Sequence, residues 1–146
     1  MTIYTIGFTK KNAEQFFETL KKNEVQMLVD VRLNNKSQLA GFTKDGDIQY
    51  FLNLCGIKYT HCDEFAPSKE LLKGYQAGDI SWDQYTAIFN EILDKRKVCA
   101  RFYNRFKEYD NVCLLCSEAT AEQCHRRLVA EKIKKETTEP IEIIHL

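Results

Sequence analysis

The chain has 146 residues, of which 44% are hydrophobic and 29% are charged, a composition typical of one globular domain over residues 1–146. Its formal net charge is zero, which excludes the overall positive field that holds nucleic acid without sequence preference. No segment approaches the roughly 20 uninterrupted apolar residues of a membrane span, and the six cysteines are too sparse for a small secreted disulfide scaffold. We therefore expect a cytoplasmic protein with reduced thiols and no membrane partner.

Short apolar runs alternate with helical patterns along the chain. The runs rich in branched and aromatic residues predict strands at 2–6, 25–31, 57–62, 111–116 and 141–146. Helices are expected to begin at the capping boxes Asn12–Gln15, Ser81–Gln84 and Thr120–Gln123, at 47–56 with Gly56 as its closing residue, within 63–79, and at 98–109. This alternation predicts a single-domain, three-layer α/β fold of the Rossmann type, with a mostly parallel sheet of about five strands.

Polar residues follow the predicted strands at the edge where parallel sheets bind ligands, outside their carboxyl ends. We expect ligand-binding roles for Gly7, Thr9, Asp30, Arg32, Glu64 and Arg126. We expect catalytic roles for Cys116, Glu118 and His125. The polar segment 32–47 is long for a loop, and such a loop at a strand's carboxyl end often covers a ligand.

Cys116 ends an apolar strand beside a predicted helix start, where a thiol can have a lowered pKa and act as a nucleophile. The alternative is a packed structural thiol. A tyrosine-phosphatase pattern would require arginine six positions later, where the chain has Glu122. Cys113 lies three positions before Cys116, so the two side chains are expected on opposite faces of the sheet rather than as a redox pair.

A zinc site built from Cys116, Cys124 and His125 is a further alternative, with His61 or Asp63 as the fourth ligand. Neighbouring positions on a helix diverge by about 100°, which is awkward for one tetrahedral ion. We therefore expect no metal. His125 is expected to point toward the sheet from one turn inside the helix, which also fits a histidine satisfied within the core.

Arg32 follows a buried strand, where its charge requires a partner. Two interpretations remain open. Arg32 either binds an anionic ligand or forms an ion pair with Glu118 or Glu64. For Asp30, bonds to backbone amides or to a helix cap are favoured over chemistry.

The segments IYTIGFTKKNAEQF, LVDVR, LNNKSQLAGF, GIKYTHCDEFAP, LLCSE and CHRRLVAE together resemble the DUF488 family of bacterial and archaeal proteins of unknown function. The resemblance implies one compact α/β domain whose polar residues gather in a cleft. Residues that match the family pattern are Asp30, Arg32, Cys116, Glu118, Cys124, His125 and Arg126. Members usually have Gly-His-Ser where this chain has Gly7-Phe8-Thr9, and phenylalanine neither carries a proton nor binds a metal.

These observations favour a small enzyme that binds an anionic ligand, either a nucleotide or a nucleic-acid end, in a cleft at the strand ends. Arg32 and Arg126 would hold the anion with help from the amides at the start of the last helix, and Glu118 or His125 would move protons. A non-catalytic binding or regulatory module and the metal site on Cys116, Cys124 and His125 remain as alternatives. The sequence specifies no cofactor, no reaction and no oligomeric state.

Overall fold

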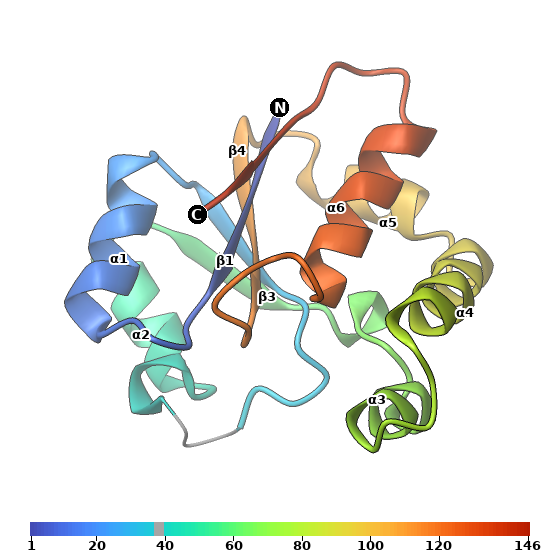
Figure 1. Cartoon of the computed structure of the whole chain (residues 1–146). Coiled ribbons are helices and arrows are strands. Elements are labelled where there is room, and N and C mark those ends of the chain that lie inside the picture. The colour runs from blue at the N-terminus through green and yellow to red at the C-terminus, as the bar shows by residue number, and fades with distance from the viewer. Residues whose placement is uncertain (37–39) are drawn as a thin grey trace.

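A computed structural model describes residues 1–36 and 40–146 and contains a five-stranded sheet in the order β3-β2-β4-β1-β5 (Figure 1). The strands are β1 (Thr2–Gly7), β2 (Met27–Asp30), β3 (Lys58–His61), β4 (Asn111–Cys116) and β5 (Glu142–His145). All neighbouring pairs are parallel, so the predicted α/β class is confirmed. The chain runs outward from β1 to β3 and then returns to β4 between β1 and β2. This reversal creates the crevice at which ligands bind in such sheets.

Helices cover both faces of the sheet (Figure 1), as right-handed crossovers require. They are α1 (Ala13–Lys22), α2 (Asp47–Leu54), α3 (Lys69–Gln76), α4 (Trp82–Lys95), α5 (Val98–Phe106) and α6 (His125–Glu136). Apolar residues of α1 and α2 form one core with the first face, and those of α3 to α6 form a second core with the other face. Within the described residues, the helices are too short or too polar to cross a membrane.

Local sequence signals account for most of the element boundaries. The capping boxes Asn12–Gln15 and Ser81–Gln84 are both present, with side-chain and backbone bonds in both directions. Gly56 follows α2 with φ +73°, the left-handed conformation that glycine adopts without strain. Cys113 and Cys116 belong to cores on opposite faces of the sheet, as their spacing predicts.

The predicted capping box at Thr120–Gln123 is wrong. Residues 117–124 form an irregular loop, and α6 begins at His125 with Cys124 as an extended N-cap residue. Tertiary bonds hold the start of this loop. The Ser117 carbonyl accepts from the Thr9 backbone and hydroxyl, and the Glu118 carbonyl accepts from Arg126 Nη1 at 2.6 Å. Hydrogen bonds to β1 and α6 therefore hold these residues in a loop, although the local sequence favours a helix start.

Gly7, at the end of β1, makes this loop position possible. A Cβ atom at Gly7 would overlap the carbonyl oxygen of Glu118 and would lie 3.0 Å from Arg126 Nη1. The backbone leaving β4 therefore crosses directly over the end of β1. Only a residue without a side chain permits that approach.

We expect Gly7→Ala to lower the free energy of unfolding by about 2–3 kcal/mol, because the added methyl group must displace backbone rather than a flexible side chain. Gly74→Ala is the matched control. In α3 its added Cβ meets Ile80 at an ordinary 3.9 Å, and replacing a helical glycine stabilises by about 0.5–1 kcal/mol. Urea denaturation of both variants measures the difference, and equal stabilities would contradict the close crossing.

Candidate functional site

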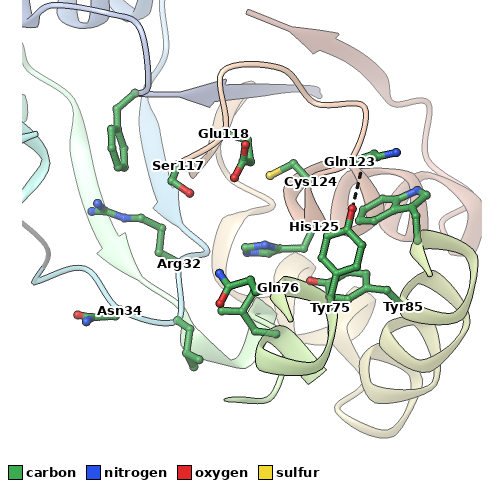
Figure 2. A pocket seen from close by; sticks show the side chains of 14 residues that line it. Arg32, Asn34, Tyr75, Gln76, Tyr85, Ser117, Glu118, Gln123, Cys124 and His125 are labelled. Atoms are coloured by element: carbon green, nitrogen blue, oxygen red, sulfur yellow. Dashed lines mark hydrogen bonds between the residues drawn. The ribbon is translucent and has the colours of Figure 1, made fainter. Parts of the chain in front are cut away.

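A pocket of about 290 Å³ lies at the carboxyl ends of β1, β2 and β4 (Figure 2). Its walls come from these strand ends, from α3 and α4, and from the start of α6. The lining residues are Phe8, Arg32, Leu33, Asn34, Leu72, Tyr75, Gln76, Trp82, Tyr85, Ser117, Glu118, Gln123, Cys124 and His125. Arg32 and His125 line the same pocket, so the two predicted site residues lie at one edge of the sheet as expected.

Cys116, Cys124 and His125 meet at the base of this region. One nitrogen or sulfur atom of each side chain lies within 4.8 Å of the others, and all three residues are buried. Cys116 Sγ is 3.6 Å from His125 Nδ1 and 3.8 Å from Nε2, so it lies beside the ring at similar distances from the two nitrogens. His125 Nε2 lies 2.6 Å from the Val31 carbonyl oxygen, which can only accept, so Nε2 carries the hydrogen. In the neutral ring, Nδ1 is therefore free to accept a proton from Cys116.

The two thiols have pKa values that move in opposite directions. The hydrogen bond from Cys124 is the main cause that lowers the pKa of Cys116 below the ordinary thiol value. Burial opposes this shift, while the Ser117 backbone and the Arg126 charge add to it. The same hydrogen bond, together with burial, raises the pKa of Cys124. Cys116 is therefore the thiol that ionises first.

Arg126 is fully buried beside these sulfurs, and its Nη1 lies 3.5 Å from Cys124 Sγ. Nη1 also donates to the Glu118 carbonyl oxygen, but Nε and Nη2 have no hydrogen-bond partner within residues 1–36 and 40–146. No carboxylate of the described chain forms an ion pair with Arg126. A buried cation without a carboxylate favours ionisation of the nearby thiol.

Arg32 has a different environment, because its charge is balanced within the chain. Nε and Nη2 donate to the two carboxylate oxygens of Asp30 at 2.8 and 2.7 Å, and Nη2 also donates to the Thr43 carbonyl oxygen. Tyr59 donates to the same carboxylate at 2.7 Å. The structure thus contains the ion pair of the second interpretation, with Asp30 in place of Glu118 or Glu64. A ligand-binding role for Arg32 stays a prediction.

The other predicted residues divide between the pocket and its surroundings. Glu118 lines the pocket and is exposed, whereas Gly7 and Thr9 position the loop that carries it. Arg126 lies behind this loop and is not among the pocket-lining residues of the described chain. Glu64 forms an ion pair with Arg105 at 2.8 Å and likewise does not line the pocket in those ranges. Residues 37–39 of the predicted covering loop lie outside the described residues.

The geometric objection to a metal at Cys116, Cys124 and His125 is wrong. Cys124 is an extended N-cap residue and His125 is the first helical residue, so their side chains converge instead of diverging. Within the described parts of the chain, the group contains neither His61 nor Asp63, the expected fourth ligands. The positive charge of Arg126 beside the sulfurs opposes a second cation. The arrangement therefore fits a thiol and thiolate pair better than an ion.

Sequence reasoning missed the aromatic wall of the pocket. Tyr75 from α3 packs against Trp82 and Tyr85 from α4, with ring centroids 5.6 and 5.1 Å away, and its hydroxyl donates to Gln123 (Figure 2). Burial and the adjacent Cys116 and Cys124 raise the pKa of Tyr85. The spacing of Trp82 and Tyr85 on one helix face was the available signal. Their meeting with Tyr75 depends on how α3 packs against α4.

We expect Arg32→Ala to lower the free energy of unfolding by about 3–5 kcal/mol, because it leaves Asp30 buried with an uncompensated charge. Arg105→Ala is the control, since its pair with Glu64 is more exposed and contributes about 1 kcal/mol or less. Denaturant melts with the Asp30→Ala single and double variants isolate the coupling energy. A loss below about 1 kcal/mol in Arg32→Ala would contradict a structural ion pair.

A known protein family matches most of the chain. The model of the family described as domain of unknown function DUF488 matches residues 12–133, which cover all of the pocket-lining residues except Phe8. No curated protein and no solved structure matches the chain. Because the match covers most of the chain, from α1 into α6, this protein belongs to the DUF488 family.

Proposed function

We propose that this protein is an enzyme that binds a small anionic ligand in the pocket and uses Cys116 as a nucleophile. His125 accepts the thiol proton, and Glu118 at the exposed rim exchanges protons with solvent. The non-catalytic binding module remains the alternative for the same pocket, and it requires no reactive thiol. The reactivity of Cys116 therefore separates the two classes.

The contact between Cys116 and His125 carries this proposal. A nucleophile, a base within reach and a third group that orients the base together form the usual arrangement of covalent catalysis. Here Cys116 Sγ lies 3.6 Å from Nδ1, and the Val31 carbonyl fixes the ring through Nε2. The sulfur-to-nitrogen distance is longer than a tight hydrogen bond, as is common in catalytic sites without a ligand.

The surrounding charges support a thiolate at Cys116. The buried guanidinium of Arg126 supplies a permanent positive charge, and the amino-terminal end of α6 begins at His125. Both features stabilise a nearby negative charge. Cys113, buried on the other side of the sheet, has a pKa that burial raises, so burial alone does not produce a reactive thiol in this fold.

The pocket itself supports a ligand with a flat, largely apolar part and a negative group. Tyr75, Trp82 and Tyr85 provide ring faces for stacking. Asp30 already balances the charge of Arg32 on the opposite wall, so the donors for a negative group are the backbone amides at the start of α6, which borders the pocket (Figure 2). A volume of about 290 Å³ admits a small molecule, or a single nucleotide from a nucleic-acid end, rather than a duplex.

The first prediction from this proposal concerns the pH dependence of alkylation. A thiolate reacts with iodoacetamide and a thiol does not, so the rate follows the pKa. We expect the midpoint for Cys116 to lie below the ordinary thiol value and that for Cys99 above it, because burial and Glu136 raise the pKa of Cys99. Peptide mass spectrometry measures both residues in the same sample.

Two variants test the cause of this shift. Cys124→Ala removes the hydrogen bond and Arg126→Met removes the positive charge, so each raises the midpoint of Cys116 and leaves that of Cys99 unchanged. Thermal melts accompany both variants to confirm folding. A Cys116 midpoint at or above that of Cys99 in the wild type would overturn the nucleophile and favour the binding module.

The second prediction concerns the ligand. A thermal-shift screen with nucleotides, phosphorylated metabolites, neutral aromatic compounds and divalent metals should find stabilisation by anionic aromatic compounds. A ligand at about 100 times its Kd stabilises the folded state by about 2.7 kcal/mol. We expect Tyr75→Leu to lose this shift and Tyr50→Leu, on the exposed surface of α2, to keep it. Stabilisation by neutral ligands alone would contradict the anionic part of the proposal.

Metal analysis of the purified protein, together with melts in the presence of a chelator, tests the metal alternative. If Cys116, Cys124 and His125 held zinc, the purified protein would contain about one equivalent and a chelator would lower its melting temperature. We expect neither result. Near-stoichiometric zinc that is lost in Cys124→Ala would replace the thiolate proposal with a metal site.

A further inference from the structure

We propose that Cys116 and Cys124 form a reactive dithiol that reduces small-molecule disulfides, with Cys116 as the attacking thiol and Cys124 as the resolving thiol. The inference rests on the proposed nucleophilic role of Cys116 and adds to it a substrate class and a partner residue. It follows from the position of Cys124, to which the proposed function assigns a hydrogen bond but no covalent step.

The geometry brings the two sulfurs together from different elements. Cys116 ends β4, Cys124 precedes α6, and their sulfur atoms lie within 4.8 Å of each other. A disulfide needs a sulfur-to-sulfur distance of about 2.0 Å. Because Cys124 has extended backbone angles outside the helix, with φ −131° and ψ 137°, its side chain can approach without unwinding α6.

The burial of Cys116 and Cys124 limits the size of a substrate that can reach them. Cys116 and Cys124 are only 4% and 2% exposed, so a disulfide on the surface of another protein does not reach them. Cys124 nevertheless lines the pocket together with Ser117 and the exposed Glu118. A small disulfide that enters the pocket therefore approaches beside Cys124 and His125, with Cys116 directly behind them, since its sulfur lies within 4.8 Å of both. The aromatic wall of Tyr75, Trp82 and Tyr85 accommodates its apolar parts.

The first step forms a mixed disulfide. Cys116 gives its proton to His125 Nδ1, and its thiolate attacks one sulfur of the substrate R–S–S–R. The substrate disulfide bond breaks, and the leaving R–S⁻ takes the electron pair and then the proton from His125. One substrate half now remains attached to Cys116.

The second step releases the other half. Cys124 gives its proton to His125, and its thiolate attacks Cys116 Sγ, so that the mixed disulfide breaks and the second R–S⁻ leaves and is protonated. In total, two protein thiols are oxidised to one disulfide, and R–S–S–R is reduced to two molecules of R–SH. Two equivalents of another low-molecular-weight thiol restore the dithiol by the same exchange and leave as their own disulfide.

The experiment uses the whole reduced chain and one equivalent of bis(2-hydroxyethyl) disulfide, followed by thiol blocking and peptide mass spectrometry. For the wild type we expect a cross-linked pair of peptides containing Cys116 and Cys124, with a loss of two hydrogens. Cys124→Ser should accumulate the mixed disulfide on Cys116. Cys116→Ser should form neither product in this region, and the control Cys99→Ser should behave as the wild type.

The outcomes separate this inference from the proposed function. If wild-type Cys116 keeps the mixed disulfide and no internal disulfide forms, the resolving role of Cys124 is overturned and the nucleophile stands. If Cys116 reacts neither with the disulfide nor with iodoacetamide, both proposals fail. Should Cys116→Ser not fold, as judged by circular dichroism, the comparison of Cys124→Ser with the wild type decides the question alone.

Discussion

The carbonyl oxygen of Glu118 is held between Gly7 and Arg126, and the position of the whole candidate site depends on that contact. A side chain on residue 7 would expel it, and Arg126 binds it at 2.6 Å. The backbone that follows β4 therefore lies in close contact with the end of β1 before the chain reverses direction. This turn carries the chain back to Cys124 and places the start of α6 beside Cys116. The contact of the Glu118 carbonyl with Gly7 and Arg126 thus holds β1, the end of β4 and the start of α6 in fixed relative positions.

The two buried arginines at this edge illustrate different uses of charge. Arg32 meets Asp30 through two parallel hydrogen bonds, and this pair, with Tyr59, makes a closed network that stabilises the carboxyl end of β2. Arg126 has no such carboxylate within the described chain, and sulfur atoms are its neighbours. A thiolate at Cys116 would complete the balance of charge. The cost of burying Arg126 is therefore linked to the ionisation of that thiol.

The sequence was sufficient for the elements whose signals are local. Alternating apolar runs gave the strands, and the boxes at Asn12 and Ser81 gave two helix starts, because a capping residue and its partner lie three positions apart. The same signal failed at Thr120, where contacts with Thr9 and Arg126 hold the chain in a loop. For the ion-pair interpretation, the sequence predicts that Arg32 pairs with a carboxylate on another strand, but Asp30, two positions earlier at the end of β2, forms the ion pair. The aromatic wall could not be predicted, because it depends on how α3 packs against α4, and local sequence patterns do not specify that packing.

Phe8 lines the pocket with a ring that cannot carry a proton, so under the proposed function the base beside Cys116 is His125. The Phe8 ring is almost buried and lies 5.4 Å from the guanidinium carbon of Arg32. A cation–π contact of this kind stabilises the arginine without changing its charge. A histidine at this position would add a second base and, when protonated, a second positive charge beside Arg32. With phenylalanine there, the imidazole adjoining Cys116 belongs to His125, and the Val31 carbonyl determines that Nδ1 is the nitrogen able to accept the thiol proton. Under the proposed function, the chemistry at this edge of the sheet therefore depends on His125, the Val31 carbonyl and the two thiols, with Glu118 at the exposed rim.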